Sequence, residues 1–163
     1  MLIKLISLCI KILKIYDVAE AAWGADAVAM REAKELVEEG FLTSSCCPAF
    51  VSLTQKKYPD LAGKVSSNPS PMAMMALSIR KTDPTAEIVF IGPCIAKKFE
   101  TLYTRTKNVV GASITFEEIQ AWFDAKGIDL HALQGVKLNK ASSYGRGFAR
   151  CGGLGDAVAE AIK

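Results

Sequence analysis

The chain has 163 residues, of which 50% are hydrophobic and 23% are charged, and its formal net charge is +3. These values fit one globular domain, residues 1–163, with a sizeable core. The slight charge and scattered basic residues argue against a nucleic-acid partner. The odd number of cysteines, five, does not fit a secreted disulfide framework and favours a reducing, cytoplasmic setting.

The amino-terminal segment, residues 1–14, is apolar but interrupted by Lys4, Lys11 and Lys14. It is too short for a membrane span, and it lacks the uninterrupted apolar core and cleavage site of a signal peptide. We therefore predict a buried or half-buried helix with Cys9 in the core. A helix lying at a membrane interface is the alternative.

The first half of the chain alternates short apolar runs with a helical pattern. Residues 15–19 predict a short strand, and residues 25–39 carry apolar side chains at helical spacing up to Gly40. Phe41-Leu42 begin a second predicted strand. Pro48 is placed in the first turn of a helix running to about residue 58, where its missing N–H costs nothing.

The central segment is organised around one buried strand. Residues 66–71 predict a loop and residues 72–80 a helix whose methionines fill the core. Residues 88–91 are β-branched and aromatic, as in a buried strand, and Gly92-Pro93 end it. Residues 109–110 predict a further short strand.

The last third contains a capping box, Thr115–Glu118, which predicts a helix over residues 116–125 that ends at Gly127. His131, the only histidine, is expected at the surface or at a helix end. The glycine-rich residues 142–155 precede a final helix, but their spacing matches neither phosphate-binding glycine motif. Strands alternating with helices predict an α/β fold: a mainly parallel sheet of about four strands, flanked by helices.

Two cysteine motifs follow the predicted strands. Cys94 comes after the central strand with Lys97 and Lys98 close behind, and nearby ammonium groups favour the thiolate form that binds metal. Alone, such a cysteine is more often buried and inert. A second motif, Cys46-Cys47 before Pro48, repeats the arrangement at a predicted helix N-terminus, which also favours a thiolate. Together the motifs predict metal ligands that converge at the carboxyl-terminal sheet edge.

Thr43–Pro48 (TSSCCP) and Pro93–Glu100 (PCIAKKFE) closely resemble the first two signatures of the iron-only ([FeFe]) hydrogenase catalytic domain. The resemblance spans roughly residues 15–163. It implies an H-cluster, a [4Fe-4S] cubane joined to a two-iron subcluster with CO and cyanide ligands. It also implies reversible oxidation of H2 to protons and electrons, with ferredoxin as electron partner. In the family, a half of the domain like this chain packs against a second, similar lobe, and the cluster lies between the two.

The resemblance also implies roles for single residues. Cys47 and Cys94 match the cubane ligands, and Cys46 matches the thiol that passes protons to the two-iron subcluster. Lys97 matches the lysine that donates a hydrogen bond to a cyanide. Pro93, which precedes Cys94 in the motif, is assigned to the cofactor-binding surface.

Gly152-Gly153 match glycines that let the backbone approach the cluster. The family's proton route runs through Cys46, a serine matching Ser66 and two glutamates, with which Glu32 and Glu35 align. A solvated helix face is the alternative for these glutamates. Glu100 matches the acid that closes the second motif, and pairing with a lysine is its alternative role.

The sequence departs from the family pattern in four places. The third motif, Cys-x-x-x-Cys, is absent, so two of the four cubane ligands are identifiable and we expect no hydrogen turnover by this chain alone. A missing second lobe implies an exposed apolar face and self-association. Cys151 could replace a missing cluster ligand, but we expect it to be a small buried residue. Gly92 replaces the usual methionine, and Phe50 a tryptophan, which suggests a divergent or sensory branch.

Two other functions stay open. One is a non-catalytic iron–sulfur relative, either a redox or H2 sensor or a cluster-assembly factor. The other is a redox protein that uses Cys46-Cys47 as a dithiol, although the chain has no Cys-x-x-Cys motif. Analysis for iron and sulfide separates these, because a dithiol protein should bind neither.

Overall fold

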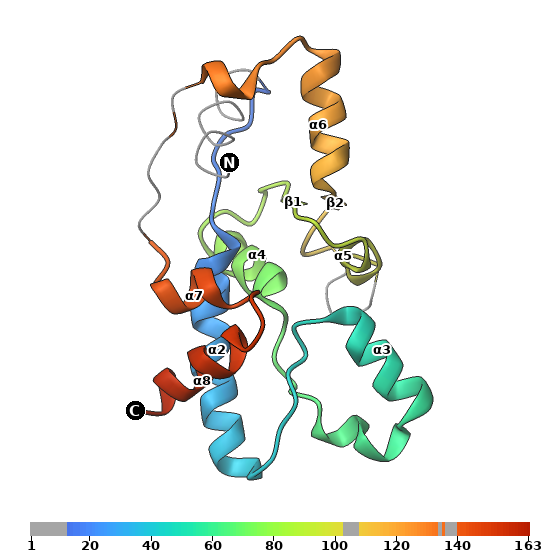
Figure 1. Ribbon diagram of the computed structural model, residues 1–163, viewed down its shortest axis with the longest axis vertical. Coiled ribbons are helices and arrows are strands. Elements are labelled where there is room, and N and C mark those ends of the chain that lie inside the picture. The colour runs from blue at the N-terminus through green and yellow to red at the C-terminus, as the bar shows by residue number, and fades with distance from the viewer. Residues whose placement is uncertain (1–12, 103–107, 134, 136–139) are drawn as a thin grey trace.

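The computed structural model describes residues 13–102, 108–133, 135 and 140–163, so the helix predicted over residues 1–14, with Cys9, lies almost wholly outside it. The described chain is mostly helical, with one small parallel sheet (Figure 1). Its α-helices are α2 (Ala21–Glu39), α3 (Pro48–Lys57), α4 (Pro71–Thr82), α5 (Ala96–Glu100), α6 (Phe116–Ala125), α7 (Ser143–Gly147) and α8 (Gly153–Ile162). Two 3-10 helices, η1 (Pro59–Lys64) and η2 (Leu130–Ala132), and two strands, β1 (Val89–Ile91) and β2 (Ala112–Ile114), complete it.

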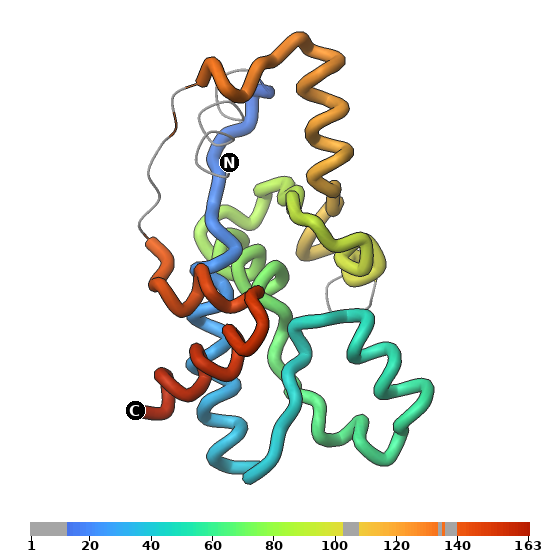
Figure 2. The backbone as a smooth tube through the Cα atoms, viewed as in Figure 1, coloured from blue at the N-terminus to red at the C-terminus, as the bar shows by residue number. Residues whose placement is uncertain are grey.

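Helix α2 is the centre of the structure, because α4, α7 and α8 all pack against it. The backbone after residue 140 returns to lie beside this helix (Figure 2). The inner face of α2 is made of small side chains, which let the neighbouring helices approach closely. The main apolar cluster joins α2 to α4, α7 and α8 and contains Ala25, Val28, Ala29, Ala33, Met74, Phe148, Ala157 and Val158.

The sheet connects this helical bundle to α6. Strand β1 pairs in parallel with β2, with Val89 opposite Ala112, and α5 lies in the crossover between them. Phe123 of α6 is 1% exposed and packs, with Ile119, against Ile91 and Ile114 of the two strands. No helix among the described residues has the length and apolar character needed to cross a membrane.

The helix predictions that fall within the described residues are confirmed. Helix α6 has the predicted bounds and capping box, while α2 begins four residues earlier than predicted and α8 three residues earlier. Residues 142–155, predicted as a glycine-rich loop, contain α7. The buried methionines of α4 and the exposed His131 at η2 also agree with prediction.

The prediction of about four strands is wrong for the described residues, where the sheet has two. Residues 15–19 form no strand, because Ile15 and Val18 pack against the cluster around Phe123 rather than beside another strand. The strand expected at Phe41-Leu42 is reduced to one parallel bridge between Thr43 and Val65. The strand after α5 lies at residues 112–114, not 109–110. Short apolar runs become strands only where tertiary structure supplies a partner.

We expect Gly24→Ala to lower the free energy of unfolding by about 1–3 kcal/mol. A Cβ at residue 24 would lie 2.2 Å from the backbone oxygen of Pro71, so α2 and α4 would have to move apart. Gly155→Ala in α8 is the matched control, because its Cβ meets nothing within 4 Å and alanine favours a helix. Denaturant unfolding followed by circular dichroism measures both. Equal stabilities of the two variants would contradict this account of the packing.

Candidate functional site

The two cysteine motifs are joined by one side chain. The Lys97 ammonium, in α5, donates a hydrogen bond of 2.9 Å to the backbone oxygen of Cys46, which is 51 residues away in the sequence. Helices α3 and α5 also pack against each other. Cys47 is the N-cap of α3, and its Sγ accepts the Phe50 N–H at 3.5 Å. Cys94 lies in the turn between β1 and α5, so the sequence motifs form one region of the fold.

The same ammonium is held by a buried carboxylate. Lys97 Nζ lies 2.6 Å from Glu100 Oε2, and the two side chains are 13% and 9% exposed. The Ser70 hydroxyl donates to the other carboxylate oxygen of Glu100 and caps α4 by accepting the Ala73 N–H. Glu100 therefore pairs with a lysine, which was the alternative prediction. In the described part of the chain the third N–H of Lys97 has no hydrogen-bond partner, and it can donate to an anion.

A second polar group connects Cys46 to α2. The Ser44 hydroxyl donates to Glu32 Oε1 at 2.8 Å and accepts the Cys46 N–H at 3.1 Å. Glu32 is 3% exposed. Burial raises the pKa of the Glu32 carboxyl, although the hydroxyl groups of Ser44 and Ser66 near it counteract part of the effect. Glu32 was predicted either on a proton route or on a solvated helix face. The structure excludes the solvated face, because Glu32 is a buried acid next to the cysteine motif.

Cys46 itself is a neutral thiol in this environment. Its side chain packs against the apolar cluster of α2, α4 and α8. Burial raises the pKa of the Cys46 thiol, and the lowering effects of Ser44 and Lys97 do not outweigh it. The prediction that the helix N-terminus favours a thiolate is therefore wrong for Cys46, because desolvation dominates.

Glu35 lies one helical turn along α2 in a very different setting. It accepts hydrogen bonds from the Ser66 hydroxyl at 2.6 Å, the Ser67 N–H at 2.8 Å and the Asn68 amide at 2.7 Å. Burial acts to raise the pKa of Glu35, but these donors outweigh it and lower the pKa below its ordinary value. The structure thus brings Glu32, Glu35 and Ser66 together, as expected.

Sequence reasoning did not assign the three polar partners Ser44, Asn68 and Ser70 to the site. Ser70 precedes Pro71, a helix-start signal that could have located its cap but not its bond to Glu100. No sequence signal pointed to Asn68, because its partners lie more than thirty residues away on α2. The same holds for Ser44 and Glu32, which are brought together only by the fold.

The thiols of Cys47, Cys94 and Cys151 are all exposed. This contradicts the prediction that Cys151 is a small buried residue. Thiolates are the usual ligands of iron–sulfur clusters, so two exposed thiols at joined motifs are candidate ligands of such a cluster. Within the described ranges no three His, Cys, Asp or Glu side chains group closely enough to hold a metal ion. The remaining ligands of a cubane are not supplied by these residues.

Three glycines near the motifs have local packing reasons. Gly92 is buried, and a Cβ there would lie 2.6 Å from the Phe90 ring, so a methionine would require this ring to move. Gly152 adopts a left-handed conformation, with φ of 76°. A Cβ on Gly153 would lie 1.9 Å from the Gly147 oxygen, so glycine there closes the turn between α7 and α8. Pro93 is exposed beside Cys94.

Several large hydrophobic side chains are exposed on the elements that carry the cysteine motifs. Large hydrophobic side chains are exposed on α3, η1 and α5 and in the segments next to them, which agrees with the expected exposed apolar face. We call these residues the α3–α5 apolar face: Phe41, Phe50, Leu53, Tyr58, Leu61, Ile95, Phe99 and Leu102. A face of this kind is typical of a surface that packs against another protein surface.

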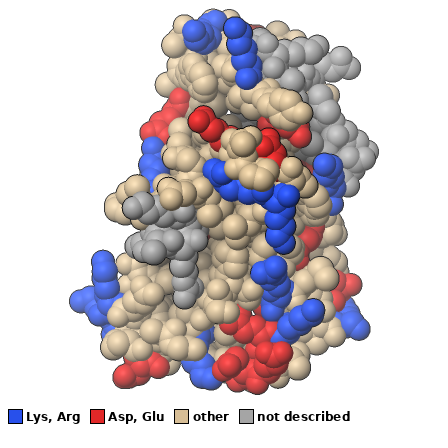
Figure 3. Space-filling model, turned by 180° about the vertical axis from the view of Figure 1, so that it is seen from behind, with Lys and Arg blue, Asp and Glu red and all other residues tan. Residues whose placement is uncertain are grey.

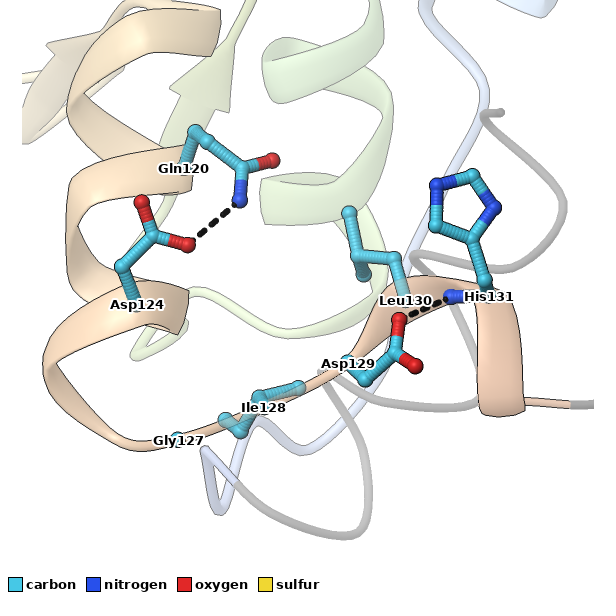
Figure 4. Close-up of a pocket in the computed structure, with 7 residues that line it drawn as sticks. All are labelled: Gln120, Asp124, Gly127, Ile128, Asp129, Leu130 and His131. Atoms are coloured by element: carbon cyan, nitrogen blue, oxygen red, sulfur yellow. Dashed lines mark hydrogen bonds between the residues drawn. The ribbon is translucent and has the colours of Figure 1, made fainter.

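Neither the distribution of surface charge nor the hollow next to η2 indicates a further ligand-binding site. On the face shown in Figure 3, basic and acidic side chains are interspersed, and neither sign covers the surface alone. A hollow of about 440 Å³ lies at the far end of α6 and next to η2 (Figure 4). Two carboxylates line it, but Asp124 accepts from the Gln120 amide and Asp129 accepts the His131 N–H. Both carboxylates therefore accept hydrogen bonds from neighbouring residues of the same segment.

Comparison with known proteins places these motifs in one family. Residues 3–163 match the family model described as "Iron only hydrogenase large subunit, C-terminal domain". Iron hydrogenase 1 of Clostridium pasteurianum is 29% identical over 172 residues, covering 92% of this chain and 29% of that protein. The cytosolic Fe-S cluster assembly factor NAR1 of Eremothecium gossypii is 29% identical over 107 residues, covering 66% and 24% respectively.

A solved structure shows the same fold. It describes stepwise [FeFe]-hydrogenase H-cluster assembly in HydA(deltaEFG), and it superposes with a TM-score of 0.81 at 26% sequence identity. The match covers 99% of this chain and 46% of that one. The present chain therefore spans less than half the length of these relatives.

Lys97→Met is expected to lower the free energy of unfolding by about 3–5 kcal/mol, because it removes one partner of a buried ion pair. Lys98→Met is the matched control in the adjacent position. Lys98 pairs with Glu118 at the surface, so its removal should change stability little. Denaturant unfolding at neutral pH compares the two variants, and a larger loss for Lys98→Met would contradict the assignment.

Glu32→Gln is expected to raise the thermal unfolding midpoint at pH 7. Because the pKa of buried Glu32 is raised in the folded state, the wild-type chain loses stability as pH rises through that pKa. Glutamine stays neutral and can still accept the Ser44 hydroxyl. The difference should vanish below the ordinary glutamate pKa of 4.5. Glu38→Gln, exposed on the same helix, is the control and should show no such pH-dependent difference.

Proposed function

The chain belongs to the iron-only hydrogenase large subunit, C-terminal domain family, and from that premise we propose that it forms part of an [FeFe] hydrogenase catalytic domain. The reaction is the reversible oxidation of H2 to protons and electrons. The observation that supports this proposal most directly is the Lys97 bridge, which joins the backbone of Cys46 to the turn that carries Cys94. One ammonium thereby ties together both family motifs.

Cys47 and Cys94 are the proposed ligands of a [4Fe-4S] cluster. Their thiols are exposed and belong to the joined motifs, so they fit iron–sulfur ligation in kind and supply two of the four ligands. When bound, the cluster and its two-iron subcluster supply the redox chemistry. The third N–H of Lys97 is available for an anionic ligand, and Pro93, Gly152 and Gly153 are proposed to border the cofactor.

The proposed proton route leads from Cys46 into α2. A neutral thiol is the form that can give up a proton, and burial keeps Cys46 in that form. Glu32 follows through Ser44, and Ser66 lies between Glu32 and Glu35. Glu35 is only half-buried, so it offers the exit toward solvent. Glu100 acts differently, because it holds Lys97 in place.

The α3–α5 apolar face is the proposed contact with the rest of the catalytic domain. Its residues lie on the elements that carry Cys47 and Cys94, so a second lobe packed there is proposed to cover both the apolar side chains and the cluster. Self-association of this chain is the alternative occupant. Ferredoxin as electron carrier and a cytoplasmic location complete the proposal.

A non-catalytic iron–sulfur relative is the second candidate function. The match to a cytosolic Fe-S cluster assembly factor supports it, as does Gly92, which packs next to the Phe90 ring where the family usually has a methionine. The third candidate, a dithiol redox protein, is disfavoured. Its nucleophile would be Cys46 or Cys47, and burial opposes ionisation of Cys46.

Anaerobic reconstitution with iron and sulfide tests cluster binding. We expect the chain to bind both and to show the visible absorption of an iron–sulfur cluster. Cys47→Ser and Cys94→Ser should each sharply reduce the bound iron, whereas Cys151→Ser is the matched control and should leave it unchanged. Absence of iron and sulfide from the wild-type chain would favour a dithiol protein.

Hydrogen evolution then separates the two iron–sulfur candidates. We expect none from the reconstituted 163-residue chain, because it supplies two of the four cubane ligands. When the chain is combined with a second lobe that carries the remaining ligands, a hydrogenase should evolve hydrogen from a reduced dye. Cluster binding without hydrogen evolution by that assembly would support the non-catalytic relative.

A further inference from the structure

We propose that Asn68 is a positioning residue of the proton route, because its amide and backbone N–H groups hold the Ser66 hydroxyl so that it donates to Glu35. The inference rests on the proposed function for its role in catalysis, but its geometry stands independently. Asn68 lies in the loop between η1 and α4 and is half-buried against α2.

The hydrogen bonds of Ser66 determine the direction of its proton. A hydroxyl has one donor and two acceptor positions. Ser66 Oγ accepts from the Asn68 backbone N–H at 3.1 Å and from the Asn68 side-chain amide at 3.1 Å. Both acceptor positions are therefore filled by one residue. The single O–H donor is directed to Glu35 Oε2 at 2.6 Å.

The same amide also acts on the carboxylate at the end of the route. Asn68 Nδ2 donates to Glu35 Oε2 at 2.7 Å, so Asn68 contacts both the donor and the acceptor of the Ser66–Glu35 hydrogen bond. These donors favour the charged form of Glu35, whereas burial favours the neutral form of Glu32. Glu32 therefore holds a proton more tightly than Glu35 does, and Glu35 is the proposed acceptor.

Transfer requires Asn68 to release one contact. A proton leaves Glu32 and forms an O–H bond with Ser66 Oγ, while the original Ser66 O–H bond breaks and its proton passes to Glu35. Ser66 can accept only when one of its two acceptor positions is vacated. The side-chain amide can rotate away, whereas the backbone N–H is fixed by the loop. The amide of Asn68 thus controls when Ser66 can relay a proton.

The surroundings of this contact are defined. The Ser45 hydroxyl donates to the backbone oxygen of Asn68 and holds the loop from the opposite side. Glu32, one turn away on the same helix, interacts electrostatically with Glu35. The charged residues Arg31, Glu38 and Glu39 also lie within about one turn of Glu35 on α2, and Glu39 pairs with Lys64 at 3.4 Å. None of these groups occupies the acceptor positions of Ser66.

The test is the titration of Glu35 in the metal-free chain, followed by carboxyl-carbon NMR. Asn68→Ala should raise the pKa of Glu35, because one donor to the carboxylate is lost. Asn68→Asp keeps the shape but places an acid beside Glu35, and should raise the pKa further. Ser45→Ala is the matched control: it removes a contact to the same residue without touching the amide, so the pKa of Glu35 should stay as in the wild type.

Two results would overturn the inference: an unchanged Glu35 pKa in folded Asn68→Ala and Asn68→Asp, or an equal shift in Ser45→Ala. Circular dichroism verifies folding, and a variant that fails to fold leaves the other to decide. Because the titration needs no cluster, its outcome is independent of iron binding. The titration therefore tests the positioning role, and reconstitution tests the proposed function.

Discussion

The site depends on the Lys97 ammonium, which lies between the backbone oxygen of Cys46 and the carboxylate of Glu100. A desolvated ammonium is costly unless a carboxylate and further acceptors surround it, and here both are present. Since Glu100 is fixed in turn by Ser70, the cap of α4, the position of the lysine is tied to the helical bundle. The cysteine motifs are therefore placed by helix packing more than by the sheet.

Opposite environments for two carboxyls on one helix follow from the same packing. Glu32 faces the core and Glu35 faces a loop rich in hydrogen-bond donors. The backbone of α2 keeps them one turn apart, so their difference in proton affinity is built into helix geometry. Ser66 lies near both, so the loop between η1 and α4 matters as much to the proposed proton route as the cysteine motifs do.

The helices could be predicted from the sequence because their ends carry local signals, such as the Thr115–Glu118 capping box and the left-handed Gly40. The central strand, predicted at residues 88–91, is confirmed as β1. The strands predicted at residues 15–19 and 41–42 were wrong, because these residues have strand-like composition but do not pair as strands. The cysteines, Lys97 and Glu100 could be found from their spacing. Ser44 and Asn68 could not, because their roles arise from hydrogen bonds to α2 that join distant segments.

The cysteines of the two motifs have different surroundings, and these suggest separate roles in the proposed function. The proposed proton route leads from Cys46 toward α2, and its hydrogen bonds are made by residues of this chain. Cys47 and Cys94 are exposed, on the elements that also carry the α3–α5 apolar face. In the proposed function, proton transfer therefore uses residues of this chain, while cluster ligation is shared with another surface. Glu32 has a structural role as well, because it accepts the Ser44 hydroxyl that in turn holds the Cys46 N–H.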